Sequence, residues 1–371
     1  MDCQNFPEIS VDMWGDALIT KLQGARFPLG GMFELTDRCN FSCVHCYINQ
    51  AANCKKALEN ELRTDEVKGI LDQMAEAGTL FLVFTGGEPL LRPDFPEIFK
   101  YARQRGIIIS LFTNGSMITP RIADLLAEWR VQSIEITLYG ATEETYERVT
   151  RVPNAFKRVQ RGISLLMERD LPLSLKSVLL TTNLHDLPAM QSYAEQLGVK
   201  FHYDGMIWPR SDGNKEPMKY QISMDQLLQL DIEDPERQKE WHRLANKYHG
   251  TIINSKYVYN CGAGLRTFHI DSKGLISICT MARKPAYDLR QMSFLEAWEK
   301  IGELRQKDRR LHTPCETCEI RAICSQCPAW SQAVHGDDET PVEFICKLSH
   351  KRAEFLQQTY IMNEEEILNY E

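Results

Sequence analysis

Six short apolar stretches alternate with amphipathic helical stretches between residues 30 and 208. Each is rich in aliphatic or β-branched side chains, as strands buried on both faces of a sheet require. The predicted strands are residues 32–35, 80–84, 107–112, 133–138, 173–179 and 200–207. Their alternation with helical stretches indicates repeated β–α units, and such units form a parallel sheet with right-handed crossovers.

The predicted helices begin and end at characteristic residues. We expect Thr64 to cap a helix with an acidic first turn, which the helix dipole favours, and Gly78 to end it. Thr119 followed by Pro120 predicts the start of another helix. Because there are six β–α units and not eight, the sequence predicts an α/β fold, an open and partial (β/α)6 TIM-like barrel. Functional loops in such a barrel follow the C-terminal ends of the strands.

The pattern changes after residue 208. Residues 209–217 form a polar connector, and residues 223–250 are charged and mostly helical in pattern. Seven cysteines then follow within fewer than ninety residues, before a final predicted helix at about 348–360. The predicted parts are an N-terminal segment (1–29), the barrel (30–208), a linker with helices (209–250), a small cysteine-rich domain (251–350) and a C-terminal helix and tail (351–371).

Composition narrows the possible functions. The 371 residues are 43% hydrophobic and 25% charged, which is typical of a soluble globular protein. A net charge of −8 argues against general affinity for nucleic acid or anionic membranes. No apolar run is long enough to span a membrane, and the first twenty residues lack a signal-peptide core. The twelve cysteines therefore predict metal ligation in a reducing cytoplasm rather than disulfides.

Three cysteines follow the first predicted strand with the spacing Cys39-x3-Cys43-x2-Cys46. A cubane iron–sulfur cluster normally takes four thiolates, and no other cysteine lies within seven residues on either side. The spacing therefore suggests a cluster with one iron left open for a reacting ligand. At this cysteine content, chance gives only about 0.01 expected matches. The alternatives are a zinc clip and unrelated core thiols.

Polar groups end the next three predicted strands. The second strand runs into Gly86, Gly87 and Glu88, where glycines allow close backbone approach and the carboxylate is an acceptor for an ammonium group. The third and fourth strands end in side chains suited to ribose hydroxyls or a carboxylate: Thr113, Asn114 and Thr137. Plain turns are the alternative for each. Their shared position beside the cysteine loop favours a binding site.

Together these motifs resemble those of the radical S-adenosylmethionine (SAM) enzymes over residues 30–208. The resemblance implies that the three cysteines hold a [4Fe–4S] cluster whose open iron is chelated by SAM. It also implies that an electron from the reduced cluster breaks the S–C5′ bond, and that the resulting 5′-deoxyadenosyl radical abstracts a substrate hydrogen. The electron would come from an external one-electron reductant, flavodoxin or ferredoxin.

The same resemblance assigns roles to further residues. Gly86, Gly87 and Glu88 would bind the methionine amino group, and Thr113, Asn114 and Thr137 would face the ribose or the carboxylate. Arg158 resembles the arginine that pairs with the methionine carboxylate, with Arg148 as a second candidate. His45 would pack toward the adenine, with ligation of the cluster as the alternative.

A second cysteine set has the spacing Cys315-x2-Cys318-x5-Cys324-x2-Cys327, followed by Cys346 and preceded by Cys261 and Cys279. A zinc ribbon is one alternative, although its two knuckles usually lie further apart. The segment resembles the SPASM extension of peptide-modifying radical SAM enzymes, which binds two auxiliary iron–sulfur clusters. By that resemblance the outer cluster is ligated by Cys315, Cys318, Cys324 and Cys346, and the inner cluster by Cys261, Cys279 and Cys327.

Two departures from the SPASM pattern leave the type and the fourth ligand of the inner cluster undetermined. No cysteine occurs in residues 253–260, where related sequences often carry one, and the last spacing is x2 where x3 is common. An open iron, a non-cysteine ligand and a [2Fe–2S] form all remain possible. Cys3 and Cys54 fall outside both sets, and Cys54 is a candidate hydrogen-atom donor.

The expected function is radical modification of a ribosomally made precursor peptide by a cytoplasmic enzyme. Because the residues before the first strand are too few for a precursor-binding domain, a separate small recognition protein is a further expected partner. The alternatives are formylglycine maturation of sulfatases with Asp271 as base, and a tetrapyrrole or aminosugar substrate. A non-catalytic iron–sulfur or zinc protein is a further alternative, against which the loop at residues 86–88 argues. The sequence does not specify the bond formed, the fate of SAM or the oligomeric state.

Overall fold

All six predicted strands of the partial barrel are present in the computed structural model, which describes residues 25–48, 50–248 and 256–368. Each strand lies parallel to its neighbour in the order β1-β4-β5-β6-β7-β8. Their bounds are β1 Gly30–Thr36, β4 Phe81–Gly86, β5 Ile108–Thr113, β6 Ser133–Thr137, β7 Leu173–Val178 and β8 Lys200–Asp204. The predicted α/β fold with its parallel sheet is therefore confirmed.

The sheet does not stop at its first strand. On the other edge of β1 lies β9 (Thr267–Ile270), which is parallel to it, followed by the antiparallel strands β10 (Leu275–Ser277) and β11 (Ala286–Asp288). The cysteine-rich half thus extends the barrel sheet to nine strands. The predicted domain limits stay predictions. The limit at 250/251 and most of the segment 1–29 lie outside the described residues.

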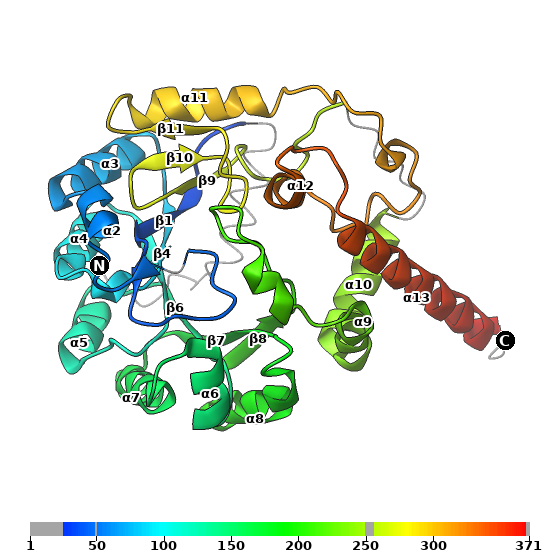
Figure 1. The fold of residues 1–371 in the computed structure, drawn as a ribbon, viewed down its shortest axis with the longest axis horizontal. Coiled ribbons are helices and arrows are strands. Elements are labelled where there is room, and N and C mark those ends of the chain that lie inside the picture. The colour runs from blue at the N-terminus through cyan, green and yellow to red at the C-terminus, as the bar shows by residue number, and fades with distance from the viewer. Residues whose placement is uncertain (1–24, 49, 249–255, 369–371) are drawn as a thin grey trace, which may run out of the picture.

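Helices cover the outer face of the curved sheet (Figure 1). Their bounds are α2 Lys55–Asn60, α3 Thr64–Glu76, α4 Phe95–Gln104, α5 Pro120–Glu128, α6 Glu143–Thr150, α7 Ala155–Met167 and α8 Leu187–Leu197. Thr119 caps α5 as predicted, because its hydroxyl accepts a hydrogen bond from the Ile122 amide at 3.3 Å. Gly78, with φ of +88°, follows the C-cap of α3. The predicted cap at Thr64 is wrong, since its hydroxyl donates to Asp94 at 2.7 Å and the helix cap is Arg63.

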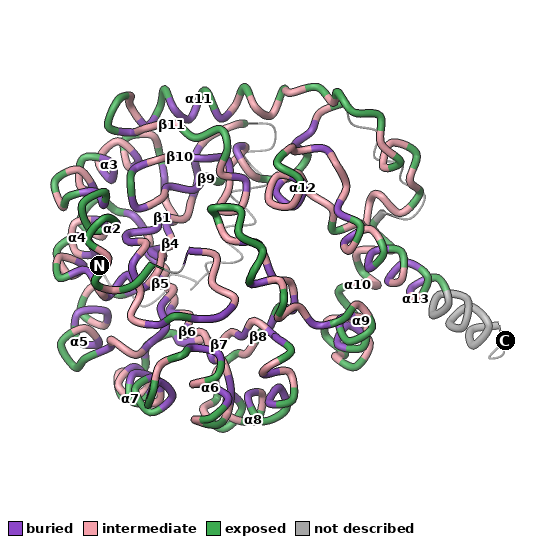
Figure 2. The backbone as a smooth tube through the Cα atoms, in the orientation of Figure 1, coloured by how far each residue is buried: buried purple, intermediate pink, exposed green. Residues whose placement is uncertain are grey.

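The core lies between the sheet and these helices (Figure 2). Phe84 of β4 is fully buried against Phe95 of α4, with ring centroids 6.4 Å apart. Along β5 and β6, fully buried residues alternate with half-buried ones. The half-buried face carries polar pairs, such as Lys176 with Glu135 at 3.0 Å. The expectation of strands buried equally on both faces is therefore too strong, because the inner face of this open barrel meets loops rather than a second layer of helices.

The second half of the chain wraps around one edge of the barrel. Its helical elements are η4 Glu216–Tyr220, α9 Met224–Glu233, α10 Pro235–Tyr248, α11 Phe294–Leu304, α12 Pro328–His335 and α13 Glu343–Leu368. The helix α13 begins before the predicted residue 348 and lies with α9 and α10 on the side opposite α3 and α4 (Figure 1). Arg352 of α13 pairs with Asp231 of α9 at 2.6 Å. In the described part of the chain, no helix combines the length and apolarity needed to cross a membrane.

Candidate active site

The loop with the first three cysteines follows the C-terminal end of β1, where the barrel rule places functional groups. It is closed by two short parallel strands, β2 (Arg38–Cys39) and β3 (Gln50–Ala51). The amides of Ser42 and Val44 donate to the carbonyls of Thr150 and Val149, each at 3.0 Å, and so anchor the loop to the end of α6. Cys43 is buried within this loop.

The chemistry of the three thiols fits an iron–sulfur cluster. Burial, and then the nearby Glu88 carboxylate, raise the pKa of Cys39 to about 12, and burial raises the pKa of Cys43 well above its ordinary value. Ligation requires thiolates, so a bound centre must supply positive charge. Among residues 25–48, 50–248 and 256–368, no three His, Cys, Asp or Glu side chains are placed to hold a single metal ion. The three thiols lie on one loop, as the predicted [4Fe–4S] cluster requires, and ligation itself stays a prediction.

Two side chains from strand ends contact these thiols directly. The Asn114 amide, after β5, donates to Cys39 Sγ at 3.7 Å and to Asn40 Oδ1 at 2.9 Å. The Tyr139 hydroxyl, after β6, is hydrogen-bonded to the Cys43 thiol. Sequence reasoning assigned no role to Tyr139, although its position after a predicted strand was the available signal.

The loop of Gly86 and Gly87 packs directly on the chain that leads to the first cysteine. The Gly87 amide donates to the Thr36 carbonyl at 2.7 Å, and the Glu88 amide donates to the Arg38 carbonyl at 2.9 Å. A Cβ atom at residue 87 would lie 2.6 Å from the Arg38 carbonyl carbon, and Gly86 has a φ of +132°. The sequence predicted that these glycines let the backbone approach a ligand closely. The structure shows that the glycines are required by the protein's own backbone.

Glu88 is a fully buried carboxylate held by three hydrogen bonds. Its oxygens accept hydrogen bonds from the Thr113 hydroxyl at 2.7 Å, from the backbone amide of Asn114 at 2.8 Å and from the backbone amide of Leu90 at 3.0 Å. Burial raises its pKa to about 7. No ion pair within the described part of the chain includes Glu88. A buried carboxylate without a cationic partner fits the amino group of SAM.

The remaining predicted residues lie around this centre in different environments. Thr137 is half-buried at the end of β6, and its carbonyl accepts from the Tyr146 hydroxyl at 3.0 Å. The Arg158 guanidinium lies 5.7 Å from the Phe41 ring centroid in the cysteine loop. Arg148 instead pairs with Glu144 on its own helix at 2.6 Å. The structure therefore places Arg158, rather than Arg148, beside the cysteine loop, and the SAM contacts themselves stay predictions.

His45 lies inside the cysteine loop. Its ring centroid is 5.3 Å from that of Tyr139, and its Nδ1 atom is buried without a hydrogen-bond partner in the described structure. Burial lowers the pKa of His45 to about 4. The imidazole is therefore neutral near pH 7 and packs against an aromatic ring of the protein.

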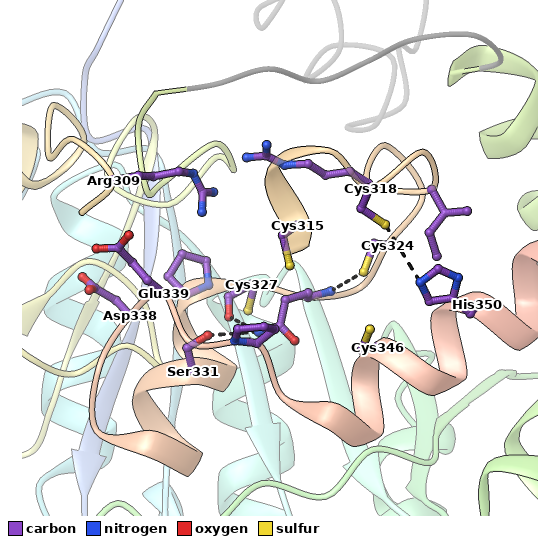
Figure 3. Close-up of a pocket in the computed structure, with 15 residues that line it drawn as sticks. Arg309, Cys315, Cys318, Cys324, Cys327, Ser331, Asp338, Glu339, Cys346 and His350 are labelled. Atoms are coloured by element: carbon purple, nitrogen blue, oxygen red, sulfur yellow. Dashed lines mark hydrogen bonds between the residues drawn. The ribbon is translucent and has the colours of Figure 1, made fainter. Parts of the chain in front are cut away.

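The C-terminal cysteines lie in two groups. Cys279 is close enough to Cys261 for their charges to interact, and Cys327 is close to both. Figure 3 shows the second group, in which cysteines of the loop before α12 face Cys346 of α13. That group consists of Cys315, Cys318, Cys324 and Cys346, and Cys327 lines the same pocket, so Cys327 lies between the two groups. The structure thus brings together the members of each predicted ligand set, while ligation stays a prediction.

His350, which sequence reasoning missed, lies one helical turn after Cys346. Its Nε2 atom is 4.0 Å from Cys318 Sγ (Figure 3). The i, i+4 spacing on one helix was the available signal, because it places both side chains on the same face. His350 therefore lies at the edge of the second cysteine group.

Two other candidates from the sequence have structural roles. Asp271 lies in the turn between β9 and β10, where its Oδ1 accepts from the amides of Lys273 and Leu275, each at 2.9 Å. Burial raises the pKa of Asp271. Cys54 is half-buried before α2, with its Sγ atom 3.7 Å from Gln50 Oε1, and Cys3 lies outside the described residues. The turn hydrogen bonds account for the position of Asp271, and its role as a base stays a prediction.

A buried ionic network connects the first cysteine loop with the second half of the chain. Glu34 of β1 is fully buried, forms a bidentate pair with Arg283 at 2.6 and 2.9 Å and accepts from the Tyr47 hydroxyl at 3.0 Å. Its carboxylate is also 3.3 Å from His269 of β9. Burial alone would raise the pKa of Glu34, but His269 and Arg283 lower it below its ordinary value. Since Tyr47 follows Cys46 and Arg283 lies four residues after Cys279, the network joins the two cysteine regions.

Comparison with known proteins now adds to this geometry. The family model described as the radical SAM superfamily matches residues 33–193. The PqqA peptide cyclase of Bradyrhizobium diazoefficiens is 33% identical over 329 residues, which cover 84% of this chain and 84% of the relative. The chain belongs to the radical SAM superfamily. Membership implies that it is an enzyme that uses SAM and a [4Fe–4S] cluster.

Other similar proteins carry different names. The AdoMet-dependent heme synthase of Methanosarcina barkeri is 29% identical over 328 residues, covering 82% of this chain and 92% of the relative. Among solved structures, Streptococcus suis SuiB bound to its precursor peptide SuiA has a TM-score of 0.68 at 17% identity, covering 93% of this chain and 84% of that one. Native anSMEcpe with bound AdoMet has a TM-score of 0.64 at 15% identity, and the match covers 92% of this chain and 100% of that one. At these identities the structures establish a shared fold.

Proposed function

We propose that this radical SAM enzyme modifies a ribosomally synthesised peptide, and that residues 251–350 form a domain whose auxiliary iron–sulfur clusters bind substrate or transfer electrons. The observation that carries the proposal is the gathering of the C-terminal cysteines into two groups, separate from the loop of Cys39, Cys43 and Cys46. Support comes from the 33% identity to a relative named PqqA peptide cyclase and from the fold shared with SuiB, which was solved with a precursor peptide.

The first centre requires distinct contributions from the chain. Bound to its cluster, SAM supplies a 5′-deoxyadenosyl radical that removes a hydrogen atom from the substrate. The three cysteines of the first loop would ligate the cluster, and Tyr139 donates to one of them, which favours the thiolate. Glu88 would accept the SAM ammonium group from a buried, preorganised position, and Arg158 would pair with the SAM carboxylate. Thr113, Asn114 and Thr137 would line the ribose side.

The second half would hold the auxiliary centres. We propose Cys315, Cys318, Cys324 and Cys346 as ligands of an outer cluster and Cys261, Cys279 and Cys327 as ligands of an inner one. An external one-electron reductant, flavodoxin or ferredoxin, would supply the electron that starts each turnover. A separate small recognition protein would present the precursor peptide.

A tetrapyrrole substrate is the second candidate. The specific observation in its favour is the relative named AdoMet-dependent heme synthase, which is 29% identical over most of both chains. A tetrapyrrole and a peptide both offer carbon–hydrogen bonds to the same radical. The substrate test must therefore present both.

The experiment uses the full chain after anaerobic cluster reconstitution, with dithionite and SAM. It is incubated with short peptides encoded next to its gene and, in parallel, with iron coproporphyrin III. We expect a peptide-dependent mass change and 5′-deoxyadenosine, both lost in Cys43→Ala. Turnover of the porphyrin without change to any peptide would contradict the proposal.

A further inference from the structure

A cavity of about 430 Å³ lies next to both cysteine regions. One wall is Tyr47, which directly follows the third cysteine of the first loop. Another contains Met281, two residues after Cys279, and Gln332 of α12, five residues after Cys327. This volume is within the range of small-ligand sites. A molecule held in it would lie between the first cysteine loop and the inner cysteine group.

The cavity is cationic although the whole chain has a net charge of −8. Its lining includes Arg210, Lys215, Arg283 and Lys284, with Asp212 as the one carboxylate among the described residues that line it. Arg283 is neutralised by its bidentate pair with Glu34. The other three cations form no ion pair within the described chain.

Two carboxylates lie near these cations: Asp212 lines the cavity, and Glu216, which pairs with Lys219, is close enough to Arg210 for their charges to interact. The Lys215 ammonium donates to the Val334 carbonyl at 3.0 Å, which is a neutral acceptor. The Asp212 carboxylate accepts from the Asn214 amide at 2.9 Å and so serves the loop itself. Lys215 and Lys284 are exposed residues, whereas Arg210 is half-buried. Because three cations stand against Asp212 and a Glu216 that is already paired with Lys219, an anionic group that enters the cavity would meet net positive charge.

Hydrogen bonds between distant segments fix the walls. The Ser211 amide donates to the Tyr47 carbonyl at 2.9 Å, which attaches the connector to the cysteine loop. Gln332 accepts from the Lys284 amide at 3.0 Å and donates to its carbonyl at 2.6 Å. The backbones that carry the cations are therefore held in place before a ligand arrives, which lowers the entropic cost of binding.

We propose that this cavity binds a carboxylate of the substrate through Arg210, Lys215 and Lys284, and so holds the substrate between the two cysteine regions. The inference rests on the proposed function and narrows it, because the substrate peptide must carry aspartate or glutamate near the residue that reacts. Tetrapyrrole propionates share this carboxylate chemistry. The experiment therefore includes both sources.

Binding is measured on the reconstituted full chain with SAM, by fluorescence anisotropy of a labelled peptide that carries glutamates in an alanine background. Its glutamine counterpart is the uncharged probe, and coproporphyrin III, followed by absorbance, is the propionate probe. The double variant Arg210→Gln, Lys215→Gln removes two cavity cations. The control Lys55→Gln, Lys56→Gln makes the same charge change on the exposed helix α2.

We expect the cavity variant to bind the glutamate peptide at least about tenfold more weakly, because charge-assisted hydrogen bonds are lost. The glutamine peptide should bind weakly to every protein, and the control should match the wild type. Arg210→Lys with Lys215→Arg should restore most of the affinity, and unchanged iron content and circular dichroism would show that the fold is intact.

Each other outcome has a defined meaning. Equal affinity for the glutamate and glutamine peptides, or an equal loss in the control variant, would overturn the cavity assignment even if a peptide is modified. If only coproporphyrin III shows the dependence on Arg210 and Lys215, the cavity assignment stands and the peptide function is wrong. If no probe binds in a charge-dependent way, the cavity assignment is wrong whatever the enzyme modifies.

Discussion

Replacing Gly87 with alanine tests whether the close packing of two loops keeps the first cluster site in place. The added methyl group would overlap the Arg38 carbonyl oxygen most closely, and it would lie 2.6 Å from the Arg38 carbonyl carbon and 2.8 Å from the Asp37 carbonyl oxygen, whereas ordinary contacts begin at 3.4 Å. These neighbours are backbone atoms, so rotation of a side chain cannot relieve the overlap. The two loops must separate by more than about 0.8 Å, because lengthening the 2.6 Å distance to 3.4 Å takes that much and the Arg38 carbonyl oxygen lies closer still.

Because Arg38 directly precedes the first cysteine, this separation moves the cluster site relative to Glu88. A displacement near 1 Å in a reacting geometry costs on the order of 100-fold in rate, and overpacking costs about 1–3 kcal/mol of unfolding free energy. The assay is 5′-deoxyadenosine formation with dithionite and SAM, together with denaturant unfolding. Gly69→Ala is the matched control, because Gly69 is exposed on α3 with nothing within 4 Å of an added Cβ. A Gly87→Ala protein with wild-type rate and stability would refute the packing argument.

Three further changes test other parts of the account. The pKa of Glu88 is raised to about 7 from an ordinary 4.5, so its buried charge destabilises the fold progressively as pH rises between these values. In cluster-free protein, the free energy of unfolding of Glu88→Gln should therefore rise relative to that of the wild type by up to about 3 kcal/mol as the pH increases from about 4.5 to about 7.5. Denaturant titrations at each pH measure this difference, and parallel pH profiles of the two proteins would contradict the prediction. Arg283→Ala should lower the free energy of unfolding by about 3–5 kcal/mol, because the buried Glu34 carboxylate loses its guanidinium partner and keeps only His269 and Tyr47. Arg148→Ala on the exposed surface should change that free energy by less than about 0.5 kcal/mol, and similar losses in the two variants would contradict the network. Asn114→Ala removes a hydrogen bond to the Cys39 thiol, so it should lower the iron content after reconstitution and lower the Tm by roughly a few degrees. Unchanged iron content would show that the contact is dispensable.

The barrel could be predicted because its determinants are local. Apolar strands of the right length recur with helices between them, and consecutive parallel strands become neighbours in the sheet. Since β1, β4 and β5 lie side by side, their C-terminal ends bring the cysteine loop, Glu88 and Asn114 into contact. The candidate site therefore follows from the order of the strands together with the residues that end them.

What could not be predicted depends on segments far apart in the chain. Nothing in the sequence near β9 indicates that it pairs with β1, because its partner lies more than two hundred residues away. The helix α3 is capped by Arg63 and not by the predicted Thr64, whose hydroxyl donates a hydrogen bond to Asp94 before α4. Glu34 is a carboxylate inside an apolar strand, and its partner Arg283 belongs to the second half of the chain. Long-range partners decided each of these features.

The central claim is that the loop of Cys39, Cys43 and Cys46 holds a cluster with one iron free to bind SAM. The most direct measurement is the electron paramagnetic resonance spectrum of the dithionite-reduced, reconstituted protein before and after addition of SAM. We predict that SAM changes the spectrum and that Cys43→Ala abolishes this change while the signals of other centres persist. Spectra that superimpose with and without SAM in the wild-type protein would contradict the claim.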